Sequence, residues 1–123
     1  MRYMMFIKHQ ENFKMEDVPQ SFMNAMGQFV ERGFRDGSLV DTAGLQRTAK
    51  GNRVRLSGGK ITVIDGPFAE TKEVIGGYAL IEAKSHDQAL ALATQFMDLH
   101  RIHWPQFEGE CEVRPLESIE QRP

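Results

Sequence analysis

Hydrophobic positions divide the first third of the chain into a strand followed by a helix. Residues 2–8 form an almost unbroken apolar run, which is typical of a strand covered on both faces. From Phe22 to Phe34, apolar residues recur at spacings of three and four, which places them along one side of a helix. Pro19 suits the first turn of this helix, and Gly37 follows where helices commonly end in a left-handed residue.

The middle of the chain has the pattern of short strands joined by turns. Residues 38–48 predict a short, irregular strand and loop. The alternating segments 53–56 and 60–64 flank the sequence Ser-Gly-Gly at 57–59, and adjacent glycines supply the positive φ angles of a tight hairpin turn. The mostly apolar segment 76–83 predicts a strand in the centre of a sheet.

A second helix and a final strand are predicted near the end of the chain. Ser85 and Gln88 have the spacing of a capping box, so a helix should begin there. Apolar residues line one side of this helix as far as His100, and Pro105 prevents its continuation. Residues 111–116 can then supply the last strand.

This element order predicts an α+β fold in which two helices pack on one face of a mainly antiparallel sheet. The order is that of a ferredoxin-like fold with an added β-hairpin. The first strand and the strand at 76–83 lack a polar side, although the sheet face opposite the helices would meet solvent in a monomer. We therefore expect a homodimer in which two sheets face each other.

Composition narrows the class of protein. The chain has 123 residues and a mass of 14.0 kDa, so we treat 1–123 as a single domain. Its 15 basic and 17 acidic residues nearly balance, so the composition does not predict a basic surface that would bind nucleic acid or anionic lipid. No apolar run approaches the roughly 20 residues of a membrane helix. Because Cys111 is the only cysteine and no signal peptide opens the chain, we expect a cytoplasmic location.

The first candidate for chemistry is the point where the strand before Asp65 gives way to turn and charged residues. Gly66 precedes Pro67 and can reach backbone conformations that a side chain would forbid. Two interpretations remain open. In one, this is a rigid corner, where Asp65 caps a turn and Phe68 anchors the core. In the other, Asp65 is a general base and Lys72 is the cation for an anionic substrate.

The second candidate is the histidine pair at the end of the second predicted helix. His100 and His103 are three residues apart and can share a helix face. His100 could instead bond free carbonyls at the helix end, with Trp104 packed over that end, which leaves His103 as the catalytic candidate. We read Cys111 as a small buried hydrophobe, and we expect no metal site and no cofactor.

The sequence Asp65-Gly66-Pro67-Phe68, with residues 69–73 and the Gly-Gly-Tyr at 76–78, resembles the DGPF-domain branch of the YCII-related family. The resemblance runs from the opening strand to 112–116 and so covers nearly the whole chain. It implies a dimeric α+β barrel of ferredoxin-like fold. Some members of this branch occur beside or fused to extracytoplasmic-function sigma factors, and most have no established activity.

Some YCII-like relatives are small lyases or dehalogenases that use a His-Asp pair, with the histidine on the first helix. This chain has no histidine between Glu16 and Asp36, so it departs from that pattern. Pairing Asp65 with His103 is therefore a separate hypothesis, which rests on no family motif.

Together these observations predict a homodimer that binds a small anionic or aromatic metabolite in a cleft near the loop after Asp65. The reaction class that fits these residues is a cofactor-independent elimination or isomerisation, as in a lyase or isomerase. The predicted catalytic residues are Asp65 and His103. The predicted binding residues are Gly66, Pro67, Phe68, Glu70, Thr71 and Lys72. The alternative is a non-catalytic regulatory module that pairs with a sigma factor.

Overall fold

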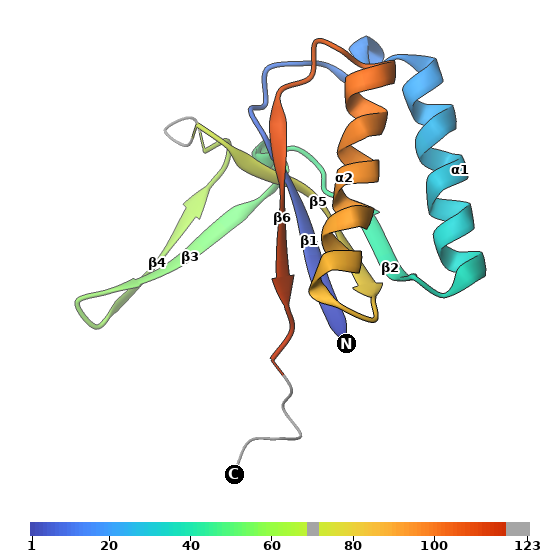
Figure 1. Ribbon diagram of the computed structural model, residues 1–123. Helices are drawn as coiled ribbons and strands as arrows, with labels where there is room; N and C mark the ends of the chain where they lie inside the picture. Colours follow the sequence, from blue (N-terminus) through green and yellow to red (C-terminus); the bar gives the residue numbers. More distant parts are fainter. Residues whose placement is uncertain (69–71, 118–123) are drawn as a thin grey trace.

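The computed structural model describes residues 1–68 and 72–117 (Figure 1). Its strands are β1 (Arg2–His9), β2 (Leu39–Gly44), β3 (Asn52–Ser57), β4 (Lys60–Asp65), β5 (Val74–Glu82) and β6 (Gly109–Pro115). Its α-helices are α1 (Gln20–Asp36) and α2 (His86–His103), and the single-turn 3-10 helices are η1 (Met15–Asp17) and η2 (Thr48–Lys50). Within the described residues, neither long helix is apolar enough to cross a membrane.

Four strands form one antiparallel sheet in the order β2-β5-β1-β6. The two apolar strands predicted at 2–8 and 76–83 are therefore its central strands, β1 and β5. Both long helices lie on one face of this sheet (Figure 1). The α+β arrangement predicted from the element order is confirmed, and it is compatible with a ferredoxin-like fold.

The helix ends follow the local chemistry of the sequence. Gly37 terminates α1 in the left-handed conformation with φ of 83°, which a residue without Cβ adopts at no steric cost. Ser85 begins α2, and its hydroxyl oxygen accepts a hydrogen bond from the backbone N–H of Gln88 at 3.1 Å. The Gln88 side chain reaches back to the backbone N–H of Lys84, so both predicted helix ends are confirmed.

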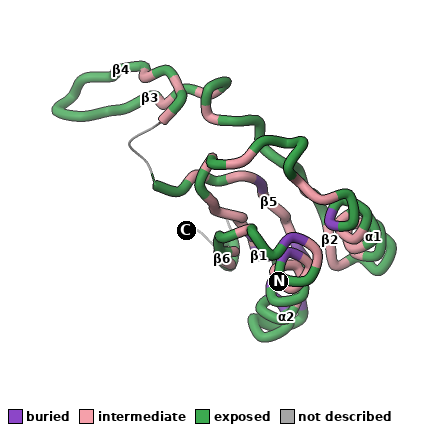
Figure 2. Tube along the Cα trace, turned by 90° about the horizontal axis from the view of Figure 1, so that it is seen from above, coloured by how far each residue is buried: buried purple, intermediate pink, exposed green. Residues whose placement is uncertain are grey.

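The core lies between the sheet and α2. Tyr3, Met5 and Ile81 point from the central strands toward the helices, where they meet Ala89 and Ala93 of α2. The side chains of α2 at this contact are small, so the helix lies directly on the sheet. By contrast, only one residue of α1 is buried. Figure 2 draws most of this helix in pink and green, the colours of half-buried and exposed residues.

The opposite face of the sheet has an apolar centre, with charged residues such as Arg2, Lys8, Glu112 and Arg114 around it. Side chains alternate between the two faces of a strand, so Met4 and Phe6 of β1 point away from the helices, as does Leu80 of β5. These three side chains are partly buried by their neighbours within the sheet. Both helices cover the other face.

The strands β3 and β4 form a separate two-stranded sheet, here called the arm, which extends away from the helices (Figures 1 and 2). Its turn uses Gly58 and Gly59, both with positive φ, as the sequence predicts. Two cross-strand pairs, Val54 with Val63 and Leu56 with Ile61, share one face of the arm. Each of these four side chains is at least 66% exposed.

Candidate functional site

The chain after β4 forms a corner that packs tightly against η2. The backbone N–H of Gly66 donates to the carbonyl of Gly51 at 2.9 Å, and the peptide bond between Gly66 and Pro67 is cis. A Cβ at position 66 would lie 1.7 Å from the carbonyl oxygen of Thr48. Glycine is required here because two backbone segments approach each other more closely than any side chain allows.

Hydrogen bonds tie this corner to the loop after β1. Thr48 donates from its backbone N–H and its hydroxyl to the carboxylate of Glu11, at 2.8 and 2.5 Å. The same hydroxyl accepts the backbone N–H of Phe68 at 3.3 Å. Arg47 donates to the carbonyls of Glu11 and Phe13. The corner is therefore held by residues far apart in the sequence.

The charge of Glu11 is favoured by this arrangement. Burial raises its pKa, but the hydrogen bonds from Thr48 and the positive charge of Arg47 lower it by more, so the pKa of Glu11 lies below its usual value. Sequence analysis missed Glu11 and Thr48, because nothing in their local sequence shows that they meet.

The predicted site residues at the corner have structural partners. The exposed carboxylate of Asp65 accepts a hydrogen bond from the Asn52 side chain at 2.6 Å, across the open end of the arm. The half-buried ring of Phe68 lies under the guanidinium of Arg53, 3.8 Å from its carbon to the ring centroid. Pro67 is exposed. Phe68 is not one of the buried core residues, and these contacts leave both interpretations of the corner open.

The remaining predicted site residues are dispersed. Lys72 is exposed and borders an open hollow with Phe107 and Trp104, whereas Glu70 and Thr71 lie outside the described residues. His103 is half-buried in the last turn of α2. In the part of the chain that the structure describes, no hydrogen bond or ion pair joins His103 to Asp65.

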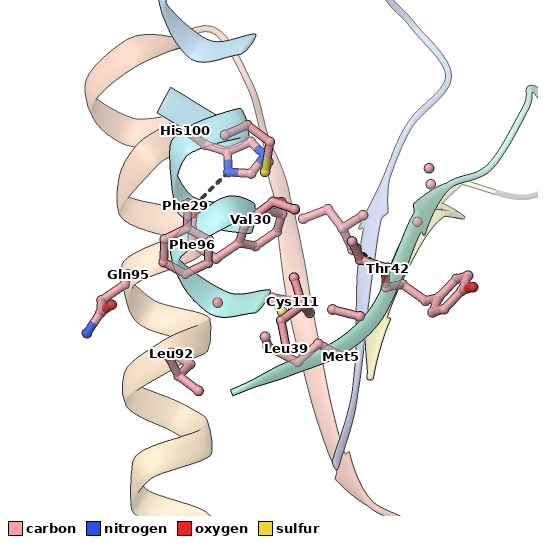
Figure 3. A pocket seen from close by; sticks show the side chains of 18 of the residues that line it. Met5, Phe29, Val30, Leu39, Thr42, Leu92, Gln95, Phe96, His100 and Cys111 are labelled. Carbon is pink, nitrogen blue, oxygen red and sulfur yellow. Dashed lines mark hydrogen bonds between the residues drawn. The ribbon is translucent and has the colours of Figure 1, made fainter. Parts of the chain in front are cut away.

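An apolar cavity lies elsewhere, between α1, α2 and the sheet (Figure 3). It has a volume of about 480 Å³. Most of its lining is aliphatic or aromatic and comes from both helices and the central strands. These residues are Met5, Ile7, Phe22, Met26, Phe29, Val30, Leu39, Leu92 and Phe96. The apolar side of α1 is thus only partly buried because it faces this space.

Glycines on β5 open the floor of the cavity. Gly76 and Gly77 line it without side chains. A Cβ on Gly76 would lie 2.0 Å from Nε2 of His9, and one on Gly77 would lie 3.0 Å from the carbonyl oxygen of Ala43. The glycines let the His9 ring and strand β2 approach β5 closely.

His100 is the one buried polar or charged residue among those that the structure describes, with 5% of its surface exposed. Its Nδ1 lies 3.1 Å from the carbonyl oxygen of Phe96 (dashed line in Figure 3). Rings of Phe22 and Phe107 surround it at centroid distances of 4.5 and 4.4 Å. Burial lowers the pKa of His100 below its usual 6.5, so the imidazole is neutral at pH 7.

Cys111 also lines the cavity and is half-buried. Burial raises the pKa of its thiol to about 11. A thiol with this pKa stays protonated at pH 7 and is a poor nucleophile. This agrees with the interpretation of Cys111 as a small hydrophobe.

The structure therefore distinguishes the two histidines in a way that the sequence did not. His100 lines the cavity, and His103 does not. Trp104 is buried and packs against the rings of Phe13 and Phe22, as expected for a residue over the helix end. Within the described residues, no three His, Cys, Asp or Glu side chains come together as a metal site would require.

Replacing Gly66 by alanine tests the corner. Because the new Cβ would overlap the Thr48 carbonyl, Gly66→Ala should lower the free energy of unfolding by at least about 2 kcal/mol in urea titrations. The control is Gly27→Ala, since position 27 is inside α1 and has open space around it. That variant should gain roughly 0.5–1 kcal/mol. Equal stability of the two variants would contradict the close approach.

The buried imidazole of His100 makes stability depend on pH. Its pKa is lowered in the folded protein, so below pH 6.5 the unfolded chain binds more protons than the folded one. The contribution of neutral His100 to the free energy of unfolding should therefore be fully present above pH 6.5. It should be lost as the pH falls through the pKa that His100 has in the folded protein. His100→Gln should reduce the loss measured between about pH 7.5 and about pH 5.5, whereas His103→Gln should keep it. An unchanged loss in His100→Gln would contradict this assignment.

Comparison with known proteins places the chain in a family. It is 40% identical over 80 residues to an uncharacterised protein of Rhizobium meliloti (strain 1021), a match that covers 65% of this chain. The chain spans about 60% of that relative's length. The YCII-related domain matches residues 1–96, which is more than half of the chain. The protein therefore belongs to the YCII-related family.

Proposed function

We propose that this protein binds a small, mostly apolar molecule in the cavity between α1, α2 and the sheet. The observation that carries the proposal is the cavity itself, with its volume of about 480 Å³ and its aliphatic and aromatic lining. Binding sites for small molecules typically have roughly 300–1,000 Å³, apolar walls and a few polar groups. His100 is such a polar group.

The cavity is partly open to solvent, so a small molecule can enter it. Filling an apolar space with water gives those molecules few hydrogen-bond partners. A bound apolar molecule would instead restore dispersion contacts with Phe29, Phe96 and Met26.

The lining favours an aromatic or aliphatic ligand over an anionic one. The charged residues that border the cavity are Arg32 and Asp36, near the end of α1, and the Asp36 carboxylate accepts the backbone N–H of Ser38. Cys111 is protonated at pH 7. The side chains of this cavity that could transfer a proton near pH 7 are imidazoles. Catalysis by Asp65 with His103 is a separate prediction.

Filling the cavity tests the proposal. Thermal unfolding is measured with phenol, γ-butyrolactone or benzoate at millimolar concentration. A ligand present at about ten times its Kd stabilises the protein by roughly 1.4 kcal/mol, or about 3–6 °C for a domain of this size. Val30→Trp places an indole in the cavity and should abolish the shift. Gln28→Trp, on an exposed part of α1, should keep it.

The proposal fails if none of the three compounds raises the unfolding temperature of the wild type. It also fails if Val30→Trp responds as strongly as the wild type does.

The second part of the proposal is a homodimer, supported by two uncovered apolar surfaces. One is the arm face formed by Val54, Leu56, Ile61 and Val63. The other is the apolar patch of Met4, Phe6 and Leu80 at the centre of the sheet face opposite the helices. Complete burial of one such aliphatic side chain contributes roughly 1.5–3 kcal/mol. A second copy of the chain could cover both surfaces, since the arm extends away from the body that carries the sheet.

A charge placed on the arm tests the dimer. We expect light scattering to give the wild type a mass close to twice 14.0 kDa. Ile61→Lys should give a monomer of unchanged fold, because residue 61 is 66% exposed in one chain and its face would be buried in the dimer. Thr62→Lys, on the opposite face of the same strand, should remain dimeric.

A wild-type monomer would contradict the dimer and favour the second candidate function. In that case the exposed aliphatic face of the arm would suit a protein partner, as expected for a regulatory module that pairs with a sigma factor. The Asp65-Gly66-Pro67-Phe68 motif supports assignment to the DGPF branch, in which such pairing occurs. Co-purification of a sigma factor with the wild type, and its loss in Ile61→Lys, would establish this alternative.

A further inference from the structure

His100 presents a hydrogen-bonding atom that the protein itself does not use. Its Nδ1 bonds to the carbonyl of Phe96, and its Nε2 has no hydrogen-bond partner among the residues that the structure describes. The side chain is 95% buried, as its 5% exposure implies, and it lines the cavity. In Figure 3 the second ring nitrogen lies on the side of the imidazole away from the dashed bond. No buried side-chain nitrogen or oxygen of the described residues lacks a partner, so the unbonded Nε2 is an accessible atom of this largely buried side chain, and it can be reached from the cavity.

The bond to Phe96 fixes which role Nε2 can play. A carbonyl oxygen can only accept a hydrogen bond, so Nδ1 carries the hydrogen. In the neutral imidazole the other nitrogen then has a free lone pair and is an acceptor. Nε2 of His100 can therefore bind a donor, and it offers nothing to a ligand that has only acceptors.

Other polar groups of the cavity already have neighbours. The hydroxyl of Thr42 donates to the carbonyl of Tyr78 at 2.8 Å. His9 is the second imidazole at this end of the cavity. Its Nδ1 lies 2.9 Å from the carbonyl of Gln10, and its Nε2 packs against Gly76. The Nε2 of His9 lies against the backbone of β5, whereas His100 presents its Nε2 among the aromatic rings of the cavity.

The surroundings of His100 disfavour a charged ligand. Four aromatic rings, those of Phe22, Phe96, Trp104 and Phe107, lie within 6.3 Å of its centroid. The cation that borders the cavity is Arg32 on α1, whose guanidinium lies 5.9 Å from the centroid of the Phe29 ring. An anion beside His100 would lose its hydration with no adjacent full charge to replace it.

From this geometry we propose that the cavity selects an uncharged aromatic or aliphatic molecule that carries one O–H or N–H donor, which hydrogen-bonds to Nε2 of His100. Phenols and alcohols of the size of a substituted benzene are the chemical class. This inference rests on the proposed binding function and specifies the ligand that the same cavity takes.

A matched series of three compounds tests the inference by titration calorimetry at pH 7.5. The compounds are 4-methylphenol, which has a donor, 4-methylanisole, which has a similar shape and no donor, and 4-methylbenzoate, which is an anion. One hydrogen bond to this acceptor is worth about a factor of ten in affinity. The wild type should therefore bind 4-methylphenol about tenfold more tightly than 4-methylanisole, and more tightly than 4-methylbenzoate.

Variants of α2 locate the effect. His100→Phe keeps a ring among aromatic neighbours but has no acceptor, so the ratio of the two affinities should fall to about one. His103→Phe changes a histidine of the same helix that does not line the cavity, and it should keep the wild-type ratio. Should His100→Phe fail to fold, the wild-type series alone decides.

The outcomes separate the inference from the proposed function. Equal binding of 4-methylphenol and 4-methylanisole by the wild type would overturn the inference and leave the proposed function standing. Tightest binding of 4-methylbenzoate, or a preference for 4-methylphenol that persists in a folded His100→Phe, would also overturn the inference. Absence of binding by all three compounds would overturn both.

Discussion

The two helices pack unequally on one face of the sheet, and this difference determines where the core and the cavity lie. Helix α2 meets the sheet through Ala89 and Ala93, so it lies close to Tyr3 and Ile81 and forms the core. Helix α1 presents Phe29 and other large side chains instead, and these are only partly buried. A helix with small residues approaches a sheet closely, whereas large side chains above a glycine-bearing strand leave space. The cavity is the result of this difference.

The corner after β4 contributes to the structure in a different way. Glu11, Thr48 and Phe68 are joined by consecutive hydrogen bonds, and Gly66 allows the backbone to pass beside η2. This network connects the base of the arm to the end of β1. Asp65 belongs to the same region, where it bonds to Asn52. The described contacts of this motif join the end of β4 to β3 and η2, and a catalytic role for Asp65 stays a prediction.

The proposed ligand site and the proposed dimer contact lie on separate parts of the molecule. The cavity lies on the helix side of the sheet, and the uncovered apolar residues lie on the arm and on the opposite sheet face. The two proposals can therefore be tested by independent substitutions. Within the cavity, His100 provides a polar group in an otherwise apolar space, which is how small-molecule sites commonly fix the orientation of a ligand.

The sequence by itself determined the features that depend on local chemistry. Gly37 ends α1, Ser85 begins α2, and Gly58 with Gly59 turns the arm, because each conformation follows from the residue and its near neighbours. The central position of β1 and β5 followed from their apolar runs, since strands covered on both faces need no polar side.

Only the tertiary structure decided where the candidate site lies. His100 and His103 both lie in the last turn of α2. They differ in burial because Phe22 and Phe107 pack against the ring of His100. The contact of Glu11 with Thr48 likewise joins residues from separate loops. Burial, an empty volume and the loss of water around an imidazole are properties of side chains brought together by folding, so no local pattern of residues could specify them.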